Sequence, residues 1–320
     1  VGQPHFGNEA LTRARAATQA ALNRAAQDPE QLAAQNLYQL MFREHRYGLP
    51  TQGLAQNVAA FTRSQIQARH KKVMRRDNLV LAVVGNINAD TLRAVMNSVF
   101  NDLVGARGEA VGVVPDVAPN VAPNVVVPLE AEGIHITRKG PQTTLFFGQK
   151  GVARNDADFF AYYLANHILG GGGFTSRLVE KVRNEKGLAY GVYSALAPYK
   201  DRSLWFGYVA SRNETVGNAM HLIRQEMTAM AAGAISRAEL ANAKAYLTGA
   251  YALRFDSGAK IVRELLRTQL DEQGIDYFTT RNSRINAVSL GEVKAAAALL
   301  FKPDELFVSS VGQFLNQEGQ

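Results

Sequence analysis

The chain has 320 residues, of which 47% are hydrophobic and 20% charged, and its net charge at pH 7 is +7. This length is typical of two folded domains, and the composition excludes an intrinsically disordered tail. The absence of cysteine excludes disulfides, thiolate metal sites and a cysteine nucleophile.

The first third of the chain is predicted to be mainly helical. Apolar residues recur at helical spacing in four segments, residues 8–22, 29–42, 62–75 and 88–103. Pro29 suits the first position of its helix, and Thr62 suits the N-cap of the next helix. Between the last two segments, the continuous apolar run of residues 78–85 predicts a strand that is buried on both faces.

Residues 106–130 differ in composition from both flanks. They are rich in proline, glycine, valine and asparagine and have no helical period. This composition predicts an extended interdomain linker. We therefore expect one domain over residues 1–105 and a second domain over residues 131–320.

Strands and helices are mixed in the second predicted domain. Residues 133–140 and 143–151 are expected to form neighbouring strands, and residues 188–198 and 203–210 a hairpin around residues 199–202. A last strand is predicted at residues 306–311. Helices are predicted at residues 156–169, 176–184, 214–231, 236–253, 260–273 and 289–300. The hairpin favours antiparallel pairing, so the expected class is α+β.

Few residues suggest chemistry by their spacing alone. No two of the six histidines lie three to five residues apart, and the motifs of serine hydrolases and phosphate loops are absent. The basic residues are scattered and the apolar runs are short, so we expect no nucleic-acid partner and no membrane partner.

One glycine run has two interpretations. It consists of Gly170, Gly171, Gly172 and Gly173, and it precedes a predicted helix. It could be a plain flexible loop between two helices. The alternative is a mobile loop that contacts a substrate, because four glycines cost backbone entropy that a simple connection need not incur.

The stretch from Leu169 to Ser194 contains the most informative pattern. A glycine run is followed by Ser-Arg-Leu at residues 176–178, by Arg183, and by Gly-Leu-Ala directly before Tyr190. This pattern resembles the C-terminal domain of the pitrilysin/insulinase-like zinc metallopeptidases. FREHRYGLPTQG at residues 42–53 and RRDNLVLAVVGNI at residues 75–87 are similar to the rear part of that family's N-terminal domain.

The resemblance implies a fold and a role for two residues. It implies two similar α/β-sandwich-like domains, each with a mixed, largely antiparallel sheet flanked by helices, the first of them incomplete in this chain. In the family, an arginine and a tyrosine at the positions of Arg183 and Tyr190 hold the peptide backbone near the scissile bond. Without the family pattern, Arg183 would be interpreted as a surface ion pair and Tyr190 as a half-buried strand contact.

The sequence departs from the family in its metal ligands. The family binds zinc through a H-x-x-E-H helix and a second, later glutamate, and the chain contains no H-x-x-E-H. Alignment on Asp28-Pro29 puts Ala20 and Ala21 where the later glutamate is expected, and only a shift of about ten residues would bring Glu9 there. We therefore predict no metal ligand in this chain.

These departures predict that one chain binds the zinc ion and another positions the substrate. We expect a non-catalytic subunit of a bacterial heterodimeric zinc metallopeptidase, with the zinc in a homologous partner subunit and an unfolded peptide as substrate. Arg183 and Tyr190 would position the peptide in trans, and Gly170, Gly171, Gly172 and Gly173 would contact it. The alternatives are part of a self-sufficient zinc peptidase, a structural relative similar to respiratory-complex core proteins, and a chamber that binds peptides without cutting them. The compartment, bacterial periplasm or cytoplasm, stays open.

Overall fold

The computed structural model describes residues 3–43, 45–103 and 133–313, so the predicted linker, residues 106–130, lies outside the described residues. The described residues form two compact units. The sheet unit contains residues 27–49, 133–252 and 271–313, and the helical unit contains residues 3–26, 50–103 and 253–270. Each unit is described by itself.

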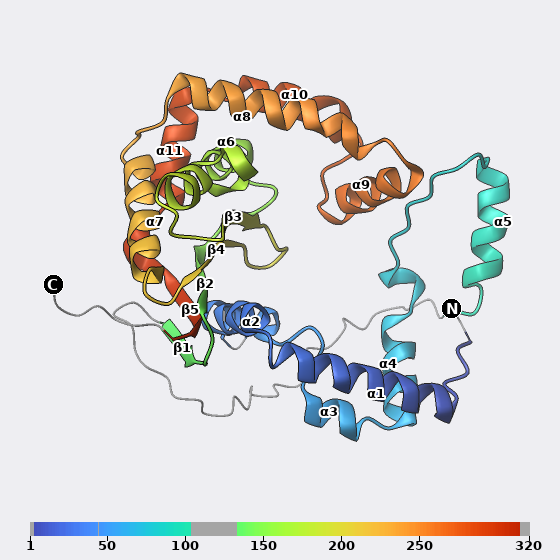
Figure 1. Ribbon diagram of the computed structural model, residues 1–320. Helices are drawn as coiled ribbons and strands as arrows, with labels where there is room; N and C mark the ends of the chain where they lie inside the picture. The colour runs from blue at the N-terminus through green and yellow to red at the C-terminus, as the bar shows by residue number, and fades with distance from the viewer. Residues whose placement is uncertain (1–2, 44, 104–132, 314–320) are drawn as a thin grey trace. The chain divides into compact units, whose positions relative to one another are not determined.

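The sheet unit is built on a five-stranded mixed sheet (Figure 1). Its strands follow the spatial order β1-β5-β2-β4-β3, in which only the pair of β1 and β5 is parallel. The α+β class and the mixed, largely antiparallel sheet are confirmed. The strands are β1 (Gly133–Thr137), β2 (Gln142–Lys150), β3 (Gly191–Ala197), β4 (Leu204–Arg212) and β5 (Phe307–Gly312).

The order of the strands corrects one prediction and confirms another. β1 and β2 were expected to be neighbours, but β5 lies between them and pairs with both. The physical reason is burial, since five of the six residues of β5 are buried, whereas β1 is mostly half-buried and suits an edge. The predicted hairpin is confirmed, because β3 and β4 pair antiparallel from Gly191 opposite Ala210 to Ala197 opposite Leu204.

Helices cover both faces of this sheet because its side chains alternate between two apolar layers (Figure 1). On one face, α2 (Pro29–Phe42) packs Ala33 and Leu37 against Phe146 and Val311. On the other face, Phe147 belongs to the larger core. That core also contains residues of α6 (Phe159–Asn166), α7 (Val216–Ala231), α8 (Arg237–Gly249), α10 (Tyr277–Ala287) and α11 (Leu290–Leu300).

Helix α10 was not predicted from the sequence. Helices were predicted at the positions of α6, α7, α8 and α11. The sequence of α10, YFTTRNSRINA, is rich in threonine and asparagine, which form helices weakly, and the side chain of its N-cap residue makes no hydrogen bond. Burial of Tyr277, Arg281 and Ile285 compensates for this weak local preference.

The helical unit contains α1 (Asn8–Ala25), α3 (Ala55–Ala60), α4 (Arg63–Val73), α5 (Ala89–Phe100) and α9 (Gly258–Leu270). Thr62 caps α4 as predicted, and it forms a reciprocal capping box with Gln65. The guanidinium of Arg15 in α1 donates to the backbone oxygen of Phe61, at the end of α3, over 2.6 Å. The short helix α3 was not predicted.

The predicted strand at residues 78–85 is not formed. Residues 79–84 follow the short 3-10 turn Arg76–Asn78 and form neither helix nor strand, and Val80, Leu81, Val83 and Val84 are each about 40% exposed. A strand needs a hydrogen-bonded neighbour, and the described part of the helical unit contains no strand to pair with. A second sheet domain is therefore not shown. None of the described helices is both long and apolar enough to cross a membrane.

A buried polar junction joins α6 to the middle of the sheet. The side-chain oxygen of Asn166, Oδ1, accepts a hydrogen bond from Ser194 Oγ and another from Trp205 Nε1, each over 2.8 Å. All three side chains are buried. A buried donor without an acceptor is costly, so this amide fixes the end of α6 over β3 and β4.

We predict that Asn166→Ala destabilises the chain by about 2–4 kcal/mol, because the substitution leaves two buried donors without an acceptor. Urea unfolding followed by circular dichroism would measure this loss. Asn184→Ala is the matched control, since among the described residues the Asn184 side chain bonds only to Glu180, at the surface. Its effect should stay within about 0.5 kcal/mol. Equal unfolding midpoints for Asn166→Ala and the unchanged chain would contradict the structural role of the junction.

Candidate functional site

Arg183 and Tyr190 lie on the two sides of one tight turn in the sheet unit. Arg183 belongs to a π-helical segment, Val179–Glu185. The chain turns two residues later at Gly187, which has a left-handed φ of 60°. The backbone N–H of Gly187 donates to the oxygen of Arg183 over 3.1 Å. Tyr190 directly precedes β3, and its backbone N–H donates to the oxygen of Ala210 over 2.8 Å. The backbone of both residues is therefore held in place.

Both side chains face solvent. The guanidinium carbon of Arg183 lies 5.7 Å from the ring centre of Phe174, in a cation–π contact, and Phe174 is 77% exposed. Tyr190 is 56% exposed. Neither the guanidinium of Arg183 nor the hydroxyl of Tyr190 has a carboxylate partner among the described residues. An exposed guanidinium and an exposed phenol can both donate hydrogen bonds to peptide carbonyl oxygens.

The glycine run has a structural role that the sequence did not reveal. Gly170 is buried in a π-helical turn, His167–Gly171, and a Cβ at Gly170 would lie 2.5 Å from Ser194 Oγ and 2.6 Å from Ser194 N. Gly173 has a φ of 59°, which side chains rarely adopt. These glycines therefore permit a close approach to β3 and a left-handed turn. Contact with a peptide stays a prediction.

We predict that Gly170→Ala destabilises the chain by about 1–3 kcal/mol, because its new methyl group overlaps the backbone of β3. Gly217→Ala in α7 is the matched control, since nothing lies within 4 Å of a Cβ there, and it should be neutral or slightly stabilising. Thermal unfolding of both variants would separate the two effects. A neutral Gly170→Ala variant would show that the close approach is not needed.

Arg177, in the Ser-Arg-Leu segment, is bound inside the sheet unit. Its guanidinium pairs with Glu239 of α8 over 2.6 Å and with Glu226 of α7 over 3.4 Å. It also donates to the backbone oxygen of Ala234. Both carboxylates are distant in the sequence, so spacing could not have revealed these pairs. Arg177 is thus engaged in joining two helices, whereas Arg183 is not.

The same contacts shift the acidity of Glu239. Partial burial raises the pKa of this carboxyl, but hydrogen bonds from Arg177 and Ser236 outweigh burial and lower the pKa to about 2 from its ordinary 4.5. A carboxyl with a lowered pKa in the folded state stabilises the fold above its unfolded pKa. This contribution is lost as the pH falls from about 4.5 through about 2.

We predict that Glu239→Gln makes the free energy of unfolding less dependent on pH between 4.5 and 2. The stability difference between the unchanged chain and this variant should be largest above pH 4.5 and should shrink toward pH 2, in urea unfolding at a series of pH values. Glu214→Gln is the control, because Glu214 has no hydrogen bond or ion pair among the described residues. A pH-independent difference for Glu239→Gln would contradict the assignment.

The described residues do not fit a zinc site. In the described part of the chain, no three histidine, aspartate or glutamate side chains come together in a group that could hold a metal ion. Ala20 and Ala21 lie in α1, as does Glu9, whose carboxylate forms an exposed ion pair with Arg13 over 2.9 Å. The two buried histidines lie apart from α1, His135 in β1 and His167 at the start of a π-helical segment. Burial lowers the pKa of each.

Comparison with curated proteins identifies related sequences. The chain is 29% identical over 272 residues to uncharacterized zinc proteases of Mycobacterium bovis and Mycobacterium tuberculosis. The matches cover 84% of this chain and 60% of each relative, so the chain spans about 60% of their length.

Comparison with solved structures identifies chains of similar fold. A peptidase M16 inactive domain from Pseudomonas fluorescens has 27% identity and a TM-score of 0.86, and the match covers 99% of this chain and 74% of that one. A protease from Helicobacter pylori, at 15% identity and a TM-score of 0.81, shares the fold over 95% of this chain and 72% of that one. A chain of complex III2 from Candida albicans does so at 19% identity and a TM-score of 0.76, over 95% of this chain and 72% of that one.

A family model described as the peptidase M16 inactive domain matches residues 60–247, which is more than half of the chain. This match contains Arg183, Tyr190, the glycine run and residues 75–87, which carry most of the resemblance. The resemblance is thereby confirmed, and the chain belongs to the M16 peptidase family, with a domain of its inactive type.

Proposed function

We propose that this chain is the non-catalytic, substrate-gripping subunit of a heterodimeric zinc metallopeptidase. The observation that carries the proposal is the exposure of Arg183 and Tyr190 at one turn, in a unit whose described residues form no metal-binding group. The zinc ion belongs to a homologous partner subunit, where it supplies the chemistry of peptide cleavage. Division of these tasks accounts for the departures at Ala20 and Ala21.

The residues of this chain bind and orient the peptide. The guanidinium of Arg183 donates to one peptide carbonyl oxygen, and the hydroxyl of Tyr190 donates to a second one. Each hydrogen bond to a charged donor contributes about 1.5–3 kcal/mol. Because the backbone of both residues is hydrogen-bonded, only their side chains need to be ordered when the peptide arrives. The ring of Phe174 supports the guanidinium from one side.

The proposed association with a partner subunit requires a fold that can occur in multi-chain assemblies. The chain of complex III2 from Candida albicans shares this fold, and its name describes a multi-chain assembly. We propose further that residues 1–105 are the rear part of a first peptidase-like domain and residues 131–320 are the second domain, joined by residues 106–130. A first domain without strands to pair with residues 78–85 would account for the exposure of Val80, Leu81, Val83 and Val84.

A second candidate function is a self-sufficient zinc peptidase. It is favoured by the names of the curated relatives, which are zinc proteases, and by the 60% of their length that this chain spans. The full-length protein, purified alone, would then contain one zinc ion per chain and hydrolyse peptides without a partner. If the full-length protein alone neither contains zinc nor hydrolyses peptides, the result favours the two-chain proposal.

We predict that Arg183→Ala lowers kcat/KM of the reconstituted two-chain peptidase by about 10- to 100-fold, since one charge-assisted hydrogen bond is lost. Tyr190→Phe should cost up to about tenfold, because a hydrogen bond from a neutral hydroxyl contributes about 0.5–1.5 kcal/mol. The measurement is cleavage of an unfolded peptide by each complex, with equal subunit association checked by gel filtration. Arg237→Ala, at an exposed arginine of α8, should be unchanged. Unaltered cleavage by Arg183→Ala would refute the gripping role.

A further inference from the structure

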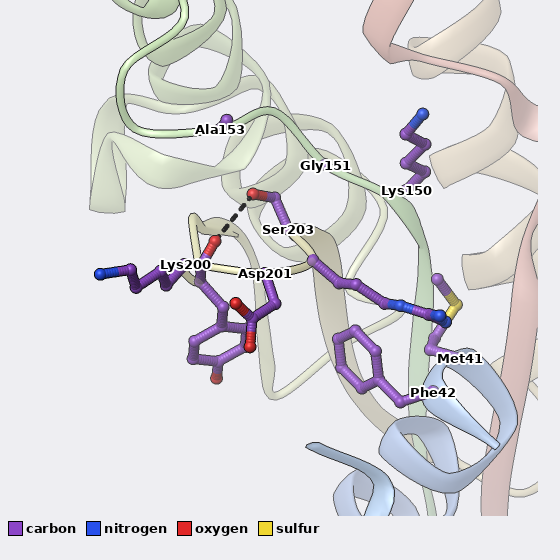
Figure 2. A pocket seen from close by; sticks show the side chains of 10 residues that line it. Met41, Phe42, Lys150, Gly151, Ala153, Lys200, Asp201 and Ser203 are labelled. Carbon is purple, nitrogen blue, oxygen red and sulfur yellow. Dashed lines mark hydrogen bonds between the residues drawn. The ribbon is translucent and has the colours of Figure 1, made fainter. Parts of the chain in front are cut away.

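A cavity of about 450 Å³ lies in the sheet unit (Figure 2). Neither Arg183 nor Tyr190 is among its lining residues. Its lining comes from the last turn of α2, the end of β2 and the turn that joins β3 to β4. The register places Ala197 and Leu204 at this end of the β3–β4 pair, whereas Tyr190 precedes Gly191 at the other end. The two sites are therefore separated by the length of β3.

The walls of this cavity are fixed by internal contacts. The hydroxyl of Tyr199 lies 2.6 Å from that of Tyr38, and its ring packs against Tyr47 with the ring centres 5.0 Å apart. The backbone N–H of Gly151 donates to the oxygen of Ser203 over 2.9 Å, and a Cβ at Gly151 would lie 2.4 Å from the backbone of β4. A rigid, preformed cavity of this size is suited to a small ligand.

The charges around the cavity do not cancel. Asp201 is neutralised by Arg46, whose guanidinium lies 2.6 Å away, and the ammonium of Lys200 pairs with Glu272 over 3.0 Å. Lys150 and Arg202 also line the cavity, and neither has an ion pair or side-chain hydrogen bond within the described residues. Figure 2 shows Lys150 and Lys200 on opposite sides of Ser203. Two positive charges are thus left for an incoming anion.

We propose that this cavity binds a carboxylate that carries a small apolar body. The carboxylate is held by Arg202, whose planar fork matches its geometry, and by the flexible ammonium of Lys150. The apolar body packs on Met41, Phe42 and the ring of Tyr199, which line the same cavity. The carboxylate belongs either to a free organic acid or to an acidic residue of a peptide. The proposal is independent of any peptidase partner.

The test uses the full chain alone and ligand-detected saturation-transfer NMR. Phenylacetate should bind saturably. Its affinity should fall with added salt, because the site is partly open to solvent. Phenylacetamide, which has the same shape without the charge, should bind about tenfold more weakly. A capped Phe-Glu peptide distinguishes the two carboxylate sources: stronger binding than phenylacetate assigns the site to peptides, and weaker binding assigns it to free acids.

The variant Lys150→Gln/Arg202→Gln should weaken phenylacetate binding about tenfold or more. Lys139→Gln/Arg237→Gln removes the same charge from exposed positions outside the cavity and should leave binding unchanged. Folding of each variant is checked by its unfolding midpoint. The proposal is overturned if phenylacetate does not bind saturably, if the amide binds equally well, or if the cavity variant binds as the unchanged chain does.

Discussion

The close contact between the π-helical turn His167–Gly171 and strand β3 is the constraint on which the candidate site depends. Position 170 favours glycine, since a Cβ there would overlap Ser194 and force a shift. Asn166 completes the contact by accepting hydrogen bonds from Ser194 and Trp205. Because β3 starts directly after Tyr190, the geometry of this contact also sets where the exposed tyrosine lies.

Two arginines in the same motif serve different purposes because their surroundings differ. Arg177 is surrounded by Glu226, Glu239 and a backbone oxygen, so its hydrogen-bonding capacity is used inside the fold. Arg183, six residues later, lies against the exposed ring of Phe174 and retains its donors for another molecule. The pattern therefore combines a structural part and a part that faces outward, and only the outward part is a candidate for function.

The two units differ in how completely they bury their apolar residues. In the sheet unit, strand β5 is paired on both sides, and Val308 and Val311 are buried. In the helical unit, residues 80–84 have the composition of a buried strand, but Val80, Leu81, Val83 and Val84 remain about 40% exposed. Neighbouring exposed apolar residues are one mark of a surface that is covered in a larger assembly. The proposed association with a second subunit and with further strands is consistent with this difference.

The sequence by itself determined the α+β class, the β3–β4 hairpin and the family, since these depend on local periodicity, turn residues and a specific motif around Arg183 and Tyr190. Only the tertiary structure decided the insertion of β5 between β1 and β2, the partners of Arg177, the close approach at Gly170 and the cavity beside Arg202. Each of these joins residues far apart in the chain. Such contacts are selected by burial and charge pairing in three dimensions, which local spacing does not encode.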